Sequence, residues 1–233
     1  MEDASSLARR DFLRVSGIAA AGLALTGCSG AAAPPPPGAG VTPPEDLMRE
    51  HGVLRRVLLV NEEILRRVEG GEFKTSAGAL RESAGIVRTF VEDYHEKLEE
   101  EHLFPRFEKA GKLVELVKTL RAQHEAGRKL TADILRLADA PCPVSEADRT
   151  ALAAAVTSFA RMYRPHAARE DTVLFPAFRD IVSPKEFDEL GDRFEDKENE
   201  LFGKDGFEKI VARVAAIEKT LGIEDLAQFT PTR

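Results

Sequence analysis

The stretch Tyr94-His-Glu-Lys-Leu-Glu-Glu-Glu-His-Leu-Phe-Pro105 returns later in the chain as His166-Ala-Ala-Arg-Glu-Asp-Thr-Val-Leu-Phe-Pro176. Aligning His95 with His166 places Glu99 on Glu170 and brings the two Leu-Phe-Pro triplets together. Residues four apart on a helix lie on one face, so each copy directs an imidazole and a carboxylate the same way. The repeat therefore predicts two helices that each present a pair of metal ligands.

Apolar residues recur at helical spacing from Pro44 onward, with few strand signals. We predict an all-α fold, an up-down-up-down four-helix bundle followed by two further helices. Glycine and proline punctuate the chain, and Pro165 inside the fourth helix predicts a kink. The four bundle helices are expected at about 45–68, 75–108, 112–137 and 145–180.

All five histidines fall within these four helices, and every helix carries at least one. The first and third helices also resemble each other, because His51 and His124 are each followed by two basic residues at the fourth and fifth positions. We infer a duplicated helical hairpin, in which each half supplies one lone histidine and one His-x-x-x-Glu pair. Two such halves would present two adjacent metal positions that Glu99 and Glu170 can bridge.

The predicted metal ligands are therefore His51, His95, Glu99, His124, His166 and Glu170. Glu96 and Asp171 are possible additional ligands, since each lies next to a predicted ligand. His102 aligns with Val173 in the repeat, and we predict a structural role for it. Imidazole and carboxylate without thiolate suit iron or manganese rather than structural zinc or an iron–sulfur cluster.

Residues 45–180, with these histidines, the two His-x-x-x-Glu pairs and the two Leu-Phe-Pro triplets, resemble a hemerythrin-like (HHE) domain. The resemblance implies a non-haem di-iron centre with bridging carboxylates that binds dioxygen or a related small molecule, and it favours iron over manganese. Oxygen-carrying members have a second histidine four residues after the third-helix ligand, where this chain has Arg128. That departure favours oxidising chemistry or iron sensing over oxygen storage, and Glu96 could occupy the position left open.

The N-terminal 28 residues read as an export signal. Arg9-Arg10 followed by Phe12-Leu13 resembles a twin-arginine signal, and the ending Leu25-Thr-Gly-Cys28 resembles the lipobox of bacterial lipoproteins. The apolar run between them is shorter than the roughly 20 residues of a membrane-spanning helix, so we favour a signal over an anchor. We expect an exported, periplasmic or cell-envelope protein that a lipid on Cys28 would attach to the membrane.

Residues 29–44 are rich in proline, alanine and glycine and are expected to form an extended tether. The chain of 233 residues, 43% of them hydrophobic, is long enough for one core. A net charge of -7 without a basic run argues against a nucleic-acid partner. Two cysteines imply no disulfide framework, and the sequence leaves the oligomeric state open.

Three functions remain open at this point. We expect a protein that binds or senses dioxygen, rather than an enzyme. A di-iron redox enzyme of peroxidase or ferroxidase type, or an iron-storage or iron-sensing protein, is the main alternative. The ferritin-like layout requires Glu-x-x-His on two helices, whereas both Glu92-x-x-His95 and Glu99-x-x-His102 lie on the second helix. The third function is a metal-free helical scaffold. Residues 181–233 are predicted to be a helical extension.

Overall fold

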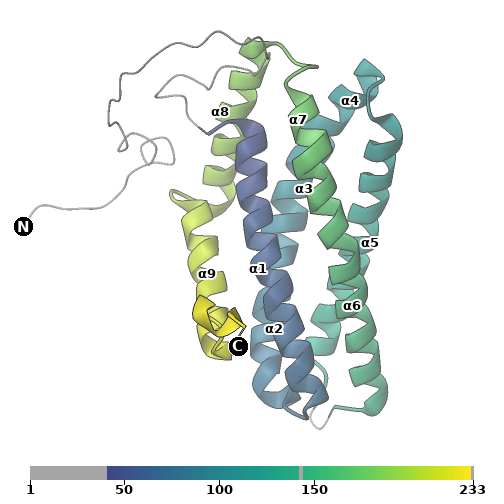
Figure 1. Cartoon of the computed structure of the whole chain (residues 1–233), viewed down its shortest axis with the longest axis vertical. Coiled ribbons are helices and arrows are strands. Elements are labelled where there is room, and N and C mark those ends of the chain that lie inside the picture. Colours follow the sequence, from purple (N-terminus) through teal and green to yellow (C-terminus); the bar gives the residue numbers. More distant parts are fainter. Residues whose placement is uncertain (1–40, 142–143, 232–233) are drawn as a thin grey trace, which may run out of the picture.

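The computed structural model describes residues 41–141 and 144–231, which contain helices and no strand (Figure 1). The prediction of an all-α fold is confirmed. The helices are α1 (Pro43–Glu69), α2 (Phe73–Ile86), η2 (Val87–His95), α3 (Glu96–Leu98), η3 (Glu99–Leu103), α4 (Phe104–Ala110), α5 (Val114–Ala138), α6 (Glu146–Arg169), η4 (Glu170–Leu174), α7 (Phe175–Phe178), α8 (Pro184–Phe202), α9 (Gly206–Leu221) and η5 (Leu226–Phe229).

Consecutive helices join end to end into four long helical segments, which are α1, α2 through α4, α5, and α6 through α7. α1 contacts α2 and α6, and α5 contacts the same two helices, so the segments surround a shared core (Figure 1). Fully buried apolar side chains from all four segments fill this core, among them Val57, Phe90, Val117 and Phe159. Burying each such side chain stabilises the fold by roughly 1.5–3 kcal/mol.

Glycine residues end the first two helical segments, and a serine begins the fourth. Gly71 and Gly111 adopt positive φ angles of 89° and 64° directly after the first and second segments. α5 begins at Val114, two residues later than predicted, because Leu113 lies in the left-handed region with a φ of 54°. The side chain of Ser145 accepts a hydrogen bond from the Asp148 backbone N–H and caps α6.

Three stretches of π-helix, η2, η3 and η4, interrupt the second and fourth segments, and the sequence did not predict them. η3 and η4 occupy equivalent positions of the internal repeat and begin at Glu99 and Glu170. In each copy a proline is the second residue after the π turn, at Pro105 and Pro176. Because proline has no N–H, the carbonyl four residues earlier, inside the π turn, lacks its usual α-helical donor. α6 itself continues through Pro165 as regular helix.

The C-terminal helices α8 and α9 pack on α1, and α9 also packs on α2 (Figure 1). Aromatic rings join the two parts, since Phe202 lies 5.7 Å from Phe90 and 5.5 Å from Tyr94 between ring centroids. Arg56 of α1 donates to Glu218 of α9 at 2.8 Å. The extension therefore covers the α1 and α2 side of the molecule.

Candidate metal centre

The four histidines from four different helical segments converge inside the protein. The Nε2 atoms of His51 and His95 lie 3.1 Å apart, and those of His124 and His166 lie 3.3 Å apart. All four side chains are buried. The fold therefore collects two pairs of imidazole nitrogens that face one another from adjacent helices.

Glu99 and Glu170 lie between the two histidine pairs. One carboxylate oxygen of Glu99 is 3.7 Å from Nε2 of His95, and the other is 3.4 Å from Nε2 of His124. Oε2 of Glu170 is 3.3 Å from Nε2 of His51 and 3.0 Å from Nε2 of His166. Each carboxylate thus reaches a histidine of both pairs, as the repeat predicted for a bridging residue.

The outer ring nitrogen, Nδ1, of every one of these histidines faces an oxygen acceptor. An imidazole whose Nδ1 is held in this way keeps its Nε2 directed inward, which is how proteins orient metal-binding histidines. Three of the acceptors are carboxylates and the fourth is an amide. The pairs are His51 with Asp171 at 2.7 Å, His95 with Glu50 at 2.8 Å, His124 with Glu100 at 3.1 Å, and His166 with Gln123 at 2.9 Å.

The four acceptors occupy equivalent positions in the two copies of the internal repeat. Glu50 and Gln123 directly precede the lone histidines of α1 and α5, and Asp171 and Glu100 directly follow the two central glutamates. The sequence reading missed Glu50 and Gln123, although their equivalent places before His51 and His124 were a usable signal. The two halves of the chain therefore repeat the outer contacts as well as the inner ones.

Asp171 and Glu96, the two possible additional ligands, lie on the outer side of the imidazoles. Asp171 bonds Nδ1 of His51 and pairs with Arg55. Glu96 is buried, accepts a hydrogen bond from the Tyr163 hydroxyl at 2.6 Å, and approaches His124 only through Nδ1, at 4.0 Å. In this geometry both carboxylates reach Nδ1 atoms and not the Nε2 atoms that face the centre.

Arg128 occupies the place where the second third-helix histidine of the oxygen carriers would stand. Its guanidinium lies 2.6 Å from Glu100 and 2.9 Å from Glu96. It thereby joins the acceptor of His124 to the carboxylate that holds Tyr163. His102, predicted to be structural, lies apart from this cluster, with its ring 5.7 Å from that of Phe194 in α8.

The central carboxylates fit a bound cation. Among the described residues, no group donates a well-aligned hydrogen bond to any of the four side-chain oxygens of Glu99 and Glu170, and both residues are fully buried. Burying a carboxylate without a partner costs several kcal/mol. A metal ion would offset that cost, and the donor set of imidazole and carboxylate suits iron or manganese.

The pKa values within the cluster also indicate that the site is suited to a bound cation. Burial and the negative charges of Glu170 and Glu96 hold the pKa of Glu99 well above its usual range. Burial opposes the charged form of Glu170, but the neighbouring His166 and His51 outweigh it and lower the pKa of Glu170. Burial also opposes the charged form of His51, yet its hydrogen bond to Asp171 and the nearby carboxylate of Glu170 raise the pKa of His51 to about 9. Without a cation, protons therefore balance the buried charge.

Groups of buried side chains suited to a metal ion form around both histidine pairs. One consists of His51, His95 and Glu99, and another of Glu99, His124, His166 and Glu170. Residues 42–178 match the model of a known family, described as the hemerythrin HHE cation binding domain. The chain belongs to the hemerythrin HHE family. The predicted resemblance is thus confirmed at the level of the family.

Nearly the whole chain is similar to other proteins of known sequence. An uncharacterized protein of Mycobacterium bovis and uncharacterized proteins of two Mycobacterium tuberculosis strains are each 47% identical to it over 239 residues. The alignment covers 98% of this chain and 92% of each relative, so it extends beyond the hemerythrin HHE domain. No solved structure matches the chain.

The predicted export signal, with Arg9, Arg10 and Cys28, lies outside the described residues, and so does most of the predicted tether. In the described part of the chain, no helix has the length and hydrophobicity needed to cross a membrane.

Proposed function

We propose that this hemerythrin-like protein holds two non-haem iron ions and binds or senses dioxygen or a related small molecule. One observation carries the proposal. Glu99 and Glu170 lie between two pairs of buried imidazoles, and their four carboxylate oxygens have no well-aligned hydrogen-bond donor among the described residues. The family match supports cation binding, and the ligand types favour iron.

The residues of this chain would divide the work as follows. His51 and His95 would hold one ion and His124 and His166 the other, with Glu99 and Glu170 bridging them. The two ions, when bound, would supply the redox chemistry. The two central carboxylates offset positive charge, while the outer acceptors keep every Nε2 directed inward.

We propose an up-down-up-down bundle of the four segments as the scaffold for this centre.

The ligand set favours reactivity over simple oxygen storage. Each position has two histidines, and Arg128 stands where the oxygen carriers have another, so fewer protein ligands fill the site. A redox enzyme of peroxidase or ferroxidase type is the second candidate. It is favoured by the buried hydrogen bond from Tyr163 to Glu96, which could deliver a proton next to His166. Burial raises the pKa of Glu96 to about 8, so this carboxyl holds a proton at neutral pH.

We also propose that the protein is exported and tethered to the cell envelope. The support is the sequence of residues 1–44, with its Arg9-Arg10 pair, apolar run, Cys28 and proline-rich stretch. A twin-arginine signal fits a metalloprotein, since that route moves folded proteins and allows iron to bind before export. Labelling with a radioactive fatty acid in a bacterial host tests lipidation, and a Cys28→Ser variant that keeps the label would contradict it.

Metal content and visible spectrum test the central proposal. We expect two irons per chain in protein purified from iron-replete cells, and an absorption band that depends on oxygen. A reversible band would support binding, whereas a band that decays while peroxide is consumed would support the enzyme.

Three single variants test the assignment of ligands. Glu99→Ala and Glu170→Ala should each lose metal, because each removes a bridge between two positions. His102→Ala is the matched control and should retain two irons, since its ring lies against Phe194 and away from the centre. Wild-type protein that binds no metal would refute the proposal.

A further inference from the structure

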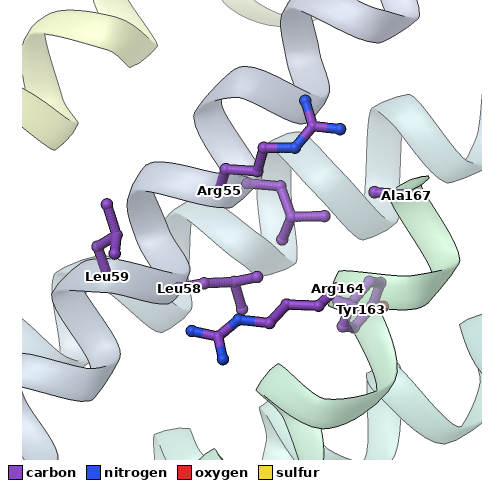
Figure 2. Close-up of a pocket in the computed structure, with 7 residues that line it drawn as sticks. Arg55, Leu58, Leu59, Tyr163, Arg164 and Ala167 are labelled. Atoms are coloured by element: carbon purple, nitrogen blue, oxygen red, sulfur yellow. The ribbon is translucent and has the colours of Figure 1, made fainter. Parts of the chain in front are cut away.

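A cavity of about 280 Å³ lies between α1 and α6 (Figure 2). Its walls are three leucines and Arg55 on α1, and Tyr163, Arg164 and Ala167 on α6. The lining is mostly apolar. A cavity of about half this volume is known to admit xenon or benzene, so several atoms of a small molecule fit here.

Two of the residues that line the cavity lie about one helical turn from predicted ligands. Leu54 follows His51 by three residues on α1, and Tyr163 precedes His166 by three residues on α6. The Tyr163 ring meets the His166 ring edge-on, with centroids 5.5 Å apart. The cavity therefore lies along the same two helices that carry His51 and His166, the two histidines that approach Glu170.

Each of the two arginines at the cavity is paired with a carboxylate from another helix. Arg55 pairs with Asp171, and Arg164 pairs with Glu62. The leucines and Ala167 supply no hydrogen bond from their side chains. Such a lining offers little to a charged ligand and suits a small uncharged one.

Two buried side chains, Leu54 and Tyr163, line the cavity at the turns of α1 and α6 next to the histidines. Tyr163 is fixed, because its hydroxyl bonds Glu96 and packs so closely on Gly127 that a Cβ there would lie 2.1 Å from that oxygen. Leu54 is 2% exposed and has no polar contact to hold it in one rotamer. A leucine side chain changes conformation by rotation about two side-chain bonds and breaks no hydrogen bond when it does so. Of the two, Leu54 is therefore the side chain that polar contacts do not fix.

We propose that this cavity is the holding site and entry route for a small uncharged molecule, dioxygen or nitric oxide in chemical class, that reacts at the centre. Leu54 acts as its inner gate, and Leu58 and Leu59 form its walls toward solvent. The inference rests on the proposed function, because it names the path to the same metal centre.

Substitutions along α1 test the route. Leu58→Trp fills the cavity, and Leu59→Trp narrows its rim at a position 47% exposed, where the fold tolerates a larger side chain. Leu54→Ala removes the gate. Leu65→Trp is the matched control, since it lines a different cavity between the same helices, about 21 Å along α1 from His51.

The kinetic measurement is the rate at which the reduced, iron-loaded protein reacts with dissolved dioxygen, followed by stopped-flow absorption and expressed per bound iron. We expect about a tenfold or larger decrease in Leu58→Trp, a smaller decrease in Leu59→Trp, an increase in Leu54→Ala and no change in Leu65→Trp. Wild-type rates in Leu58→Trp and Leu59→Trp, with iron content intact, would overturn the route while leaving the di-iron proposal in place.

Xenon provides a readout that needs no metal. Under xenon pressure, a crystal of the wild-type protein should show xenon between α1 and α6, and a crystal of Leu58→Trp should not. Absence of xenon from the wild-type cavity would overturn the holding site. Absence of iron from the wild-type protein would instead defeat the proposed function, so the two failures are distinguishable.

Discussion

At the scale of single residues, the four acceptors behind the histidines make the two metal positions unequal. His95 is backed by the carboxylate of Glu50, whereas His166, its equivalent in the repeat, is backed by the neutral amide of Gln123. A carboxylate partner increases the electron-donating strength of an imidazole more than an amide does. The position formed with His95 should therefore hold its cation more tightly.

Exchanging these two acceptors tests the inequality. Glu50→Gln should weaken metal binding by about 10–100-fold at the His95 position, and Gln123→Glu should strengthen binding at the His166 position. Competition with a chelator of known affinity measures both constants. Glu101→Gln, at an exposed neighbouring position, is the control and should change neither constant. Equal affinities in Glu50→Gln and wild type would refute the role assigned to Glu50.

Gly127 is a second residue whose identity the packing dictates. A Cβ at this position would lie 2.1 Å from the hydroxyl oxygen of Tyr163 and 2.8 Å from its ring. Gly127→Ala must displace Tyr163 and should lower the free energy of unfolding by about 1–3 kcal/mol.

Gly78 on α2 offers the matched control, because a Cβ there meets nothing within 4 Å. Gly78→Ala should raise the free energy of unfolding by about 0.5–1 kcal/mol, since alanine favours the helix. Urea denaturation of both variants measures the difference. A neutral Gly127→Ala would show that Tyr163 is free to move, which would also weaken its place as the fixed side chain of the cavity lining.

At the scale of the elements, the π turns set the direction of the bridging carboxylates. η3 and η4 each begin at a central glutamate, and each is followed by Leu-Phe-Pro. A π turn contains more residues than an α turn, so it changes which side chains share a face. The repeated proline, which withholds a donor from the carbonyl inside the π turn, gives a local reason for the wider turn to occur in both copies.

Removing that proline should restore the regular helix. In Pro105→Ala and Pro176→Ala, the new N–H can bond the carbonyl four residues earlier, which would rotate Glu99 or Glu170 away from its histidines. Each variant should gain helix stability and lose about tenfold or more in metal affinity. Pro184→Ala, at the start of α8, is the control and should bind metal as wild type does. Unchanged affinity in both test variants would separate the prolines from the bridging geometry.

At the scale of the whole molecule, the buried charges couple metal binding to pH. In the metal-free protein the pKa of His51 is raised to about 9 from the ordinary 6.5, and that of Glu96 to about 8 from 4.5. A raised pKa stabilises the fold while the group is protonated, and this stabilisation is lost as pH rises through the folded-state value. A cation must displace the His51 proton, so metal affinity should rise over the same range.

The expected result is a divergence between the two forms of the protein. The Tm of metal-free protein should fall between about pH 6.5 and 9, while the Tm of the metal-loaded protein should hold or rise, because bound metal replaces the displaced proton. Thermal denaturation at a series of pH values checks this. His51→Gln removes one of the two titrating groups and should make the decline of the metal-free curve shallower, because Glu96 still titrates with a pKa of about 8. A parallel decline in both forms would contradict the coupling.

The sequence predicted the helices and the six central ligand candidates, and it failed on features that depend on contacts between helices. Periodicity and the internal repeat are local signals, so His51, Glu99 and their equivalents stood out. The role of Glu50 depends on how α1 faces η2, which spacing along one helix does not reveal. The π turns escaped because a wider turn changes the hydrophobic period by only a fraction of a residue.

Of the four outer acceptors, one from each half of the chain contacts a histidine of its own half and one contacts a histidine of the other half. Glu50 and Gln123 serve histidines of their own hairpin, whereas Asp171 and Glu100 serve histidines of the opposite hairpin. One hairpin alone would leave its lone histidine unsupported. Two identical hairpins facing each other would satisfy every contact. This is the arrangement expected if an ancestral hairpin first worked as a homodimer and its gene later fused with a copy of itself.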